Sequence, residues 1–336
     1  MFDQIKPQRL TLMMLPLVFL SLGYFSVHHI GIERKLHFQR VEQSNLLISS
    51  DQGDHWIPLK LKNENNQQPY CFIPFGNTVY VGAAGGFTYS DVRGPVLHWT
   101  DLKLPFSTYN NIVAGLKGPI IVNRATGYSS CDATLGICSE IKMDIHGNNI
   151  LSVLETKNKG TLVSTEGGIY RQANGGKEWT KPHGKRSSYV VEAGNALLSI
   201  GREGIWRSED SGAHWQNVLY NGEEFSYIYH GKQRVYAITE PMNNGWVRMQ
   251  GTLFYSDDEG LHWNQGQHTA PKALSGIKSI AENGAYLFAV TEEGLFRSSD
   301  QGANWKQVYH LDKESGNSIQ LKTDSGRVYM LLFKGC

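Results

Sequence analysis

The side chains of this sequence that could do chemistry are, first, carboxylates in short turns between apolar segments. Glu203 lies in one such turn, and Glu292 and Glu293 lie in another at the equivalent place in the pattern. Two carboxyl groups roughly 5 to 10 Å apart can hydrolyse a glycosidic bond, one as the acid and the other as the base or nucleophile. The alternative, which we favour, is that all three are solvated turn residues.

Other catalytic or metal-binding patterns are not evident. The twelve histidines show no metal-binding spacing with cysteine, and the sequence contains neither a Walker loop nor a Ser-His-Asp order. His55, His214 and His262 each precede the Trp of a recurring motif, as His98 does in a degenerate copy, so the repeat accounts for them. Lys plus Arg number 32 against 31 Asp plus Glu, so charge does not favour nucleic acid. We predict no metal, no cofactor and no nucleic-acid partner.

The recurring motif is Ser-x-Asp-x-Gly-x-x-Trp, and the chain contains four copies of it. Ser and Asp can hydrogen-bond the amides of a loop, Gly takes a positive φ, and Trp buries its ring against the turn. Each copy therefore predicts a tight hairpin in which the Asp is structural, since no further carboxylates gather around it to bind calcium. The predicted structural residues are Ser49, Asp51, Gly53 and Trp56; Ser208, Asp210, Gly212 and Trp215; Ser256, Asp258, Gly260 and Trp263; Ser298, Asp300, Gly302 and Trp305.

Degenerate copies extend the repeat. One ends at Trp179 and another, with a longer loop, ends at Trp99. The long interval between these two tryptophans holds one further unit, which should turn near residue 135 and has no Trp. Upstream of each motif the pattern of an apolar strand, a Gly and an aromatic-bearing strand also recurs. One unit is therefore four short strands in about 41 residues, which predicts the blade of a β-propeller.

The chain ends indicate how many blades the ring has. Six complete units follow Tyr70, the C-terminal segment has only the first two strands of a unit, and the segment around Ser49–Trp56 has only the last two. Joining the two halves would close the ring and leave no exposed sheet edge. We therefore predict an all-β fold in which residues 36–336 form a seven-bladed propeller of four-stranded blades, closed by strands from both termini.

The motifs resemble the Asp-box, or BNR, repeats of sialidases, xyloglucanase-type glycosidases, sortilin-type receptors and photosystem II stability and assembly factors. The resemblance covers roughly residues 40–336 and implies the fold, but these families share little else. A sialidase would have six blades and an early Arg-Ile-Pro motif. Here Cys71-Phe72-Ile73-Pro74 has Phe in place of the Arg that would bind a carboxylate, which argues against that activity. A single propeller also cannot form the cleft between two propellers that xyloglucanase-like enzymes use.

Residues 1–35 differ from the rest and predict export. Two basic residues precede an apolar run from Leu10 to Val27, which at 1.5 Å per residue is about 27 Å long, enough to cross a bilayer core. A retained signal anchor is therefore expected, although Ser21 and Gly23 leave a cleaved signal peptide as the alternative. In either case the positive charges keep the N-terminus in the cytoplasm and place the propeller outside it, in the periplasm or the extracellular space.

The exported location predicts disulfide bonds. Cys131 and Cys138 flank the turn of the unit that lacks an Asp box, where a hairpin can bring them within bonding range. Two free buried thiols are the alternative. Cys71 opens the first complete unit and Cys336 ends the neighbouring strand of the closed ring. A second disulfide between these two residues is therefore an alternative that the sequence allows.

The ligand-binding face is predicted from loop variation. Propellers vary in the connections between second and third strands and in those between blades, whereas the box turns occupy the opposite face. The longest such connection is Thr239–Gly251, in which Trp246 and Arg248 are of the types that anchor interfaces. The alternative is that Trp246 folds back onto its own blade. The other predicted ligand-binding residues on this face are Arg124, Arg202, Glu203, His146 and His183.

The leading functional interpretation is a non-enzymatic binding or assembly scaffold at the outer side of a membrane, with a protein or glycan partner. We predict no catalytic residue on this interpretation. The alternative is a glycan-active hydrolase distantly related to sialidases, and a purely structural surface protein is a third.

Overall fold

The protein is described here by a computed structural model. It describes residues 46–61, 69–83, 85–94, 96–104, 111–134, 136–145, 148–240, 251–266, 276–311, 317–324 and 326–334. The chain divides into two units, Met1–Gln43 and Ser44–Cys336, and all of these ranges belong to the second. The predicted N-terminal anchor lies outside them. Within these ranges, a search for a helix long and apolar enough to cross a membrane finds none.

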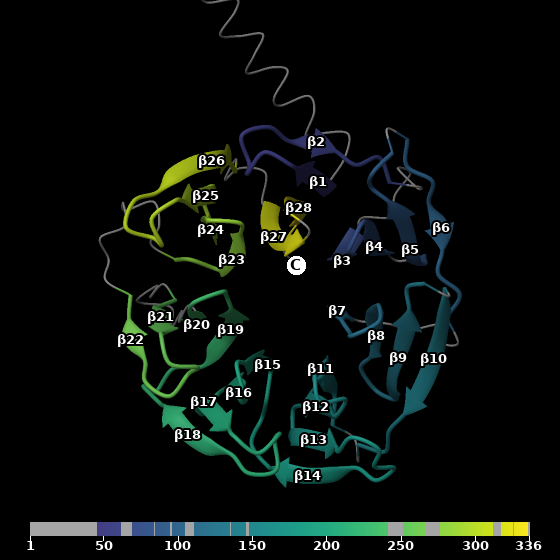
Figure 1. Ribbon diagram of the computed structural model, residues 1–336, viewed down its shortest axis with the longest axis vertical. Helices are drawn as coiled ribbons and strands as arrows, with labels where there is room; N and C mark the ends of the chain where they lie inside the picture. The colour runs from purple at the N-terminus through teal and green to yellow at the C-terminus, as the bar shows by residue number, and fades with distance from the viewer. Residues whose placement is uncertain are drawn as a thin grey trace, which may run out of the picture. The chain divides into compact units, whose positions relative to one another are not determined.

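The predicted seven-bladed propeller is confirmed: the described strands form seven four-stranded antiparallel sheets arranged around a central axis (Figure 1). Blade 1 comprises β3 (Pro69–Phe75), β4 (Thr78–Ala83), β5 (Gly86–Asp91) and β6 (Thr100–Asp101); blade 2 comprises β7 (Asn111–Ala114), β8 (Pro119–Asn123), β9 (Gly127–Asp132) and β10 (Ile137–Lys142); blade 3 comprises β11 (Ile150–Glu155), β12 (Thr161–Thr165), β13 (Gly168–Gln172) and β14 (Thr180–His183).

Three further blades follow in sequence order, and in each the first strand lies nearest the axis. Blade 4 comprises β15 (Tyr189–Ala193), β16 (Ala196–Gly201), β17 (Gly204–Ser208) and β18 (Gln216–Leu219); blade 5 comprises β19 (Phe225–His230), β20 (Val235–Thr239), β21 (Leu253–Ser256) and β22 (Asn264–Gln265); blade 6 comprises β23 (Ser279–Asn283), β24 (Tyr286–Thr291), β25 (Gly294–Ser298) and β26 (Lys306–His310).

Blade 7 combines both ends of the chain, as predicted. Its order from the axis outward is β27 (Asn317–Asp324), β28 (Arg327–Lys334), β1 (Leu46–Ser49) and β2 (Ile57–Pro58). Strands β28 and β1 pair antiparallel over four residues of β1, from Leu46 opposite Leu331 to Ser49 opposite Val328. The N-terminal strand is thus held by the C-terminal one, and the ring is closed by backbone hydrogen bonds.

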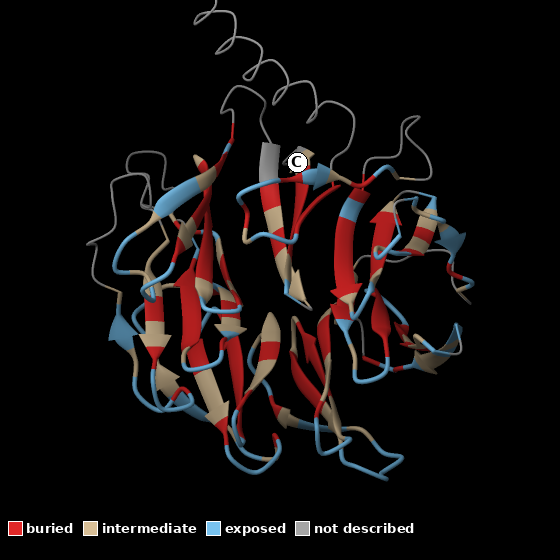
Figure 2. Ribbon diagram, turned by 45° about the horizontal axis from the view of Figure 1, so that its top comes forward, coloured by how far each residue is buried: buried red, intermediate tan, exposed pale blue. Residues whose placement is uncertain are grey.

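The hydrophobic core lies between neighbouring blades. The cluster that joins blade 7 to blade 1 contains Leu46, Tyr329 and Leu331 from one side and Phe72 and Val79 from the other. Figure 2 shows that the strands of the ring are largely buried, whereas the connections between them are exposed. Because a sheet buries both faces only against its neighbours, each blade depends on the two beside it.

The Asp boxes have the hydrogen bonds that their residue types predict. In blade 4 the Ser208 hydroxyl donates to Asp210 (2.9 Å), the Gly212 amide donates to Ser208 (2.9 Å), and the His214 amide donates to Asp210 (2.9 Å). The boxes of blades 5, 6 and 7 repeat this pattern. The box glycine has a positive φ, and so does the residue before it, such as Ser211 at 59°.

The box histidines are part of this turn. His55, His214 and His262 each place Nδ1 2.6 Å from a carboxylate oxygen of the box Asp in their own blade. In blade 6, Asn304 takes the same position and donates to Asp300 at 2.7 Å. These side chains act as carboxylate partners within the turn. A search of the described ranges finds no cluster of His, Cys, Asp and Glu suited to a metal ion.

These carboxylates predict a loss of stability in acid. Hydrogen bonds from the Asn304 side chain and amide lower the pKa of Asp300 from 3.8 to about 2. Because the folded pKa lies below the unfolded one, this stabilisation is complete above about pH 4 and is lost as the pH falls toward 2. Asp300→Asn should lower the melting temperature at pH 7, and the gap to the parent should close between pH 4 and pH 2.5. Because Asn304 does not titrate, the pH dependence of this pair comes from Asp300 alone. A difference in melting temperature that stays constant with pH would contradict this account.

The box tryptophans are less uniform than predicted. Trp56 is buried, with 8% of its surface exposed, whereas Trp215, Trp263 and Trp305 are half-buried. The indole N–H of each of these three donates to the carbonyl of the box glycine in its own turn, at 2.8 to 3.1 Å. The predicted burial of the ring is therefore complete only at Trp56 and partial at the other three.

A contact between blades was not predicted from the sequence. An arginine on the third strand of a blade donates to the backbone carbonyl of the positive-φ box residue in the next blade. The pairs are Arg171 with Ser211 (2.7 Å), Arg207 with Glu259 (3.0 Å) and Arg297 with Gln52 (2.7 Å). Arg297 also forms an ion pair with Asp54 at 3.1 Å, so this contact joins blade 6 to the closing blade.

The predicted disulfide between Cys131 and Cys138 is present and joins β9 to β10 in the blade that lacks an Asp box. Cys71, by contrast, is a free buried thiol, so the structure does not support its pairing with Cys336, which lies outside the described ranges. The Cys71 side chain packs in a hydrophobic cluster with Ile112 and Ile121 of blade 2.

Candidate functional site

The candidate site lies on the face that carries the connections between second and third strands, which we call the connection face. Its turns include Arg124–Thr126, Glu166–Gly167, Arg202–Glu203 and Glu292–Glu293. Because the strands alternate in direction, the segments between successive blades emerge on the same face. The Asp boxes and the turns between first and second strands lie on the opposite face, which we call the box face.

Charged side chains on the connection face join blades 2 and 3. Arg124 forms an ion pair with Glu166 at 3.2 Å, and Asn149 donates to the other oxygen of Glu166 at 3.0 Å. The hydrogen bond from Asn149, and then that from Arg124, lower the pKa of Glu166. The Glu166 carboxylate is therefore ionised and held, and about half of the Arg124 side chain stays exposed to solvent.

The pairing continues across blades 4 and 5. Glu224 lies between two arginines, with Arg186 at 3.8 Å and Arg202 at 3.3 Å. The field of Arg186 also acts on Glu166, which connects this group to the pair in blades 2 and 3. We call Arg124, Glu166, Arg186, Glu224 and Arg202 the charged row.

Glu203 and Tyr220 extend the candidate surface beside the charged row. Glu203 forms an ion pair with Lys185 at 3.1 Å, and its backbone carbonyl accepts from Asn217 at 2.8 Å. Tyr220 is 63% exposed, and its backbone lies against Gly204, at the end of the turn that carries Arg202 and Glu203. An exposed Tyr beside Arg is typical of interface anchors. Sequence reasoning missed Tyr220, whose position after a short outer strand gave no signal.

The structure places the predicted ligand residues in three different settings. Arg124, Arg202 and Glu203 lie together on the connection face. Trp246, Arg248 and His146 lie outside the described residues. His183, which is predicted to bind a ligand, is buried, with 5% of its surface exposed.

The surroundings of His183 explain its burial. Its ring lies 4.6 Å from the Trp206 ring and 5.8 Å from the Trp215 ring, measured between centroids. Burial lowers its pKa from 6.5 to about 4. His183 is therefore neutral at physiological pH and contributes to packing between blades 3 and 4, not to the exposed surface.

The carboxylates first considered for glycoside hydrolysis belong to separate blades. Glu203 in blade 4 pairs with Lys185, and Glu292 in blade 6 lies 3.9 Å from Lys278. A different pair is closer in the fold: the Glu240 amide donates to the Glu224 carbonyl at 2.7 Å. Burial, and then the negative charge of Glu224, raise the pKa of Glu240. The connection face thus carries one acid that keeps its proton more readily than usual beside an ion-paired carboxylate.

The repeats and the seven closed sheets together decide the architecture. The chain is an Asp-box β-propeller. No protein-family model matches its sequence, and no curated protein matches it either. Comparison with solved structures shows the same fold in a catalytically inactive virginiamycin B lyase from Staphylococcus aureus with quinupristin, at a TM-score of 0.60 and 15% identity over 82% of this chain and 98% of that one.

Two further propellers are similar in fold. YCF48 bound to D1 peptide has a TM-score of 0.55 and 16% identity, and the match covers 79% of this chain and 93% of that one. The GH74 xyloglucanase from Xanthomonas campestris has a TM-score of 0.50 and 15% identity, covering 69% of this chain and 43% of that one. At these identities the comparisons establish the fold alone.

Proposed function

We propose that this propeller is a non-enzymatic scaffold that binds a protein partner on its connection face, and that it is exported and attached to a membrane by residues 1–35. The observation that carries the proposal is the charged row. It spans four blades, its carboxylates are each ion-paired, and the side chains of Arg124 and Arg202 are 49% and 68% exposed.

The charge balance of this surface supports binding to a protein. A site for a small anion would offer arginines without carboxylate partners, whereas Arg124, Arg186 and Arg202 each have one. Alternating exposed charges beside the exposed Tyr220 ring resemble a polar rim around an anchor, the usual composition of a protein interface. A propeller of the same fold, YCF48, has been solved bound to D1 peptide, which supports only that such a fold accommodates a peptide.

The proposed location rests on the N-terminal sequence. The apolar run from Leu10 to Val27 follows basic residues, and this order directs the following chain across a membrane. The Cys131–Cys138 disulfide is consistent with an oxidising compartment. Labelling with a membrane-impermeant reagent on intact cells checks this part: reaction of the propeller supports it, and reaction only after lysis would contradict it.

The binding proposal is tested with a double variant that reverses the charge of Arg202 and removes the aromatic ring of Tyr220. The variant Arg202→Glu with Tyr220→Ala should melt within a few degrees of the parent, because both side chains are exposed. We expect at least a tenfold lower recovery of the specific partner when the tagged full chain is purified from solubilised membranes and partners are quantified by mass spectrometry. Each disrupted hot-spot residue typically costs about 2 kcal/mol or more.

Arg93 provides the matched control. Its side chain is 66% exposed, close to the 68% of Arg202, and it likewise pairs with one carboxylate, that of Asp91. It lies on the box face, so Arg93→Glu should leave recovery unchanged. Equal recovery of every partner by the Arg202 and Tyr220 variant would place the binding surface elsewhere.

A glycan-active hydrolase is a second candidate, favoured by Glu240 and Glu224. A carboxyl group whose pKa is raised, next to a second carboxyl group, is a feature that glycoside hydrolysis can use. Turnover of aryl glycosides by the full chain, lost in Glu240→Gln, would support this candidate over the scaffold. We expect no turnover, because Glu224 is occupied by two arginines.

A further inference from the structure

The innermost strands of the seven blades line the central channel of the propeller (Figure 1). On the side of blades 5 and 6, two tyrosines of β19 pack against the core between these blades and are hydrogen-bonded to β23. The Tyr227 hydroxyl donates to the Ile280 carbonyl at 2.6 Å, and the Tyr229 hydroxyl accepts from the Glu282 amide at 3.0 Å.

The other side of the channel holds a cavity of about 430 Å³, a size typical of small-molecule sites. It lies among β3, β7, β11, β15 and β27 and is lined mainly by the ends of these strands that lead to the box face. The lining includes Phe75, Val113, Ala114, Tyr189, Glu192, Lys322 and Asp324.

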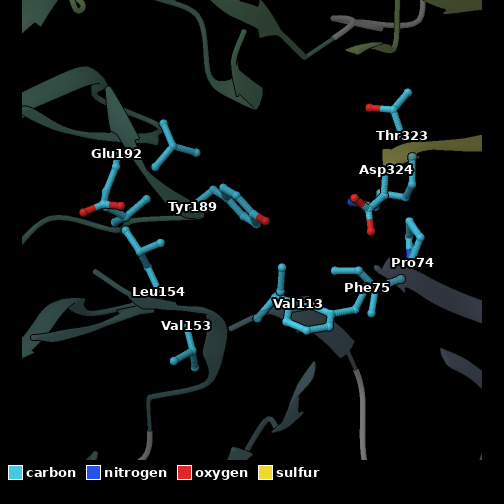
Figure 3. A pocket seen from close by; sticks show the side chains of 14 residues that line it. Pro74, Phe75, Val113, Val153, Leu154, Tyr189, Glu192, Thr323 and Asp324 are labelled. Carbon is cyan, nitrogen blue, oxygen red and sulfur yellow. The ribbon is translucent and has the colours of Figure 1, made fainter. Parts of the chain in front are cut away.

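The walls of this cavity are largely apolar. Figure 3 shows the Tyr189 ring extending into the space from β15, with Val113 nearby and Phe75 and Asp324 on the opposite side. Burying apolar ligand surface against such walls contributes about 25 cal/mol per Å². A ligand with an apolar body therefore fits the shape and chemistry of this half of the channel.

The two carboxylates in the lining are already engaged. Glu192 accepts a hydrogen bond from the Lys157 amide of blade 3 at 2.9 Å. Asp324 has a partner of its own and lies opposite Arg327 at the turn between β27 and β28. Both carboxylates therefore already take part in contacts within the ring.

Lys322 is the cation of the lining, and no residue in the described ranges forms a hydrogen bond or ion pair with its amine. Burial lowers its pKa. The titratable neighbour that acts on it is the Cys71 thiol, whose own pKa burial raises to about 12. The thiol is therefore neutral at physiological pH and supplies no counter-charge. Lys322 is half-buried in the cavity wall, so a ligand that displaces water from its ammonium must replace that solvation, which a carboxylate can do.

We propose that this cavity binds a small ligand that has an apolar body and one carboxylate, and that the carboxylate pairs with Lys322. The site is distinct from the connection face, because its lining lies toward the box face, at the other end of the innermost strands. The ligand class follows from the apolar walls, the engaged acids and the single amine. The outcome of a binding test at this cavity is independent of whether the charged row binds a protein.

The test uses three probes of nearly equal size on the full chain: 3-phenylpropionate, 3-phenylpropanol and 3-phenylpropylamine, measured by calorimetry. We expect the carboxylate to bind at least tenfold more tightly than the alcohol, and the amine to bind most weakly. Equal affinities, tightest binding of the amine, or no binding of any probe would overturn the proposal.

Variants locate the site. Lys322→Met should weaken 3-phenylpropionate at least tenfold, whereas Lys322→Arg should keep its affinity within about threefold. Ala114 is exposed in the cavity wall, so Ala114→Phe should fill space without disturbing the core and should weaken all probes that bind. Circular dichroism confirms folding of each variant. Unchanged affinity in Lys322→Met or in Ala114→Phe would place the ligand elsewhere and overturn the proposal.

Discussion

Removal of residues 326–336 should abolish the folded propeller instead of trimming a tail. This segment contains β28, which lies between β27 and β1 in blade 7. Val328, Tyr329, Met330 and Leu331 of β28 have no exposed surface. Burial of such side chains contributes about 1.5 to 3 kcal/mol each, so four contribute about 6 to 12 kcal/mol. That matches the whole stability of a typical protein, about 5 to 15 kcal/mol.

The measurement is the yield of soluble, cooperatively melting protein. A circular permutant supplies the control: a linker joins residue 334 to residue 46, and new ends open at the exposed segment near Gly222. The permutant keeps β28 paired with β1 and should fold. If only the deletion variant fails to give folded protein, the missing strand is the cause. A truncated protein with the parent melting temperature would show that blade 7 does not need both chain ends.

The sequence allowed the fold to be predicted because the repeat is local. Ser, Asp, Gly and Trp at fixed spacing specify one hairpin, and the spacing of the hairpins gives the number of blades. The half-units at the two ends then required the closure seen between Leu46 and Leu331. Even the exceptional blade could be predicted, since Cys131 and Cys138 flank its turn.

The candidate site could be predicted only in part, because it is formed between blades. The turns that carry Arg124 and Arg202 could be placed on the connection face from the repeat, but their carboxylate partners Glu166 and Glu224 lie outside these turns, in neighbouring parts of the ring. Such pairs depend on side-chain geometry across blades, which the repeat does not encode. His183 shows the same limit, since its burial depends on Trp206 of the next blade.

The box tryptophans should differ in what they contribute to stability, and Trp56 should contribute most. Its ring is 8% exposed and contacts Tyr309 of blade 6 edge to face, with centroids 6.2 Å apart. Trp56→Ala should therefore cost about 3 to 5 kcal/mol, as for other large core aromatics. Trp215→Ala should cost less, because Trp215 is half-buried. Urea denaturation measures both free energies of unfolding.

Substitution by Phe separates packing from hydrogen bonding at the same two positions. The indole N–H of Trp56 is buried without a hydrogen-bond partner in the described ranges, whereas that of Trp215 donates to Gly212 at 3.1 Å. A buried unpaired donor costs about 1 to 3 kcal/mol, so its removal in Trp56→Phe should offset much of the lost packing. Trp215→Phe gains no such offset and loses a hydrogen bond. At each position the Phe variant is compared with the Ala variant, and the fraction of stability recovered should be larger at Trp56. A larger recovery at Trp215, or loss of partner binding in a fully folded Trp215→Ala variant, would contradict the purely structural role of the boxes.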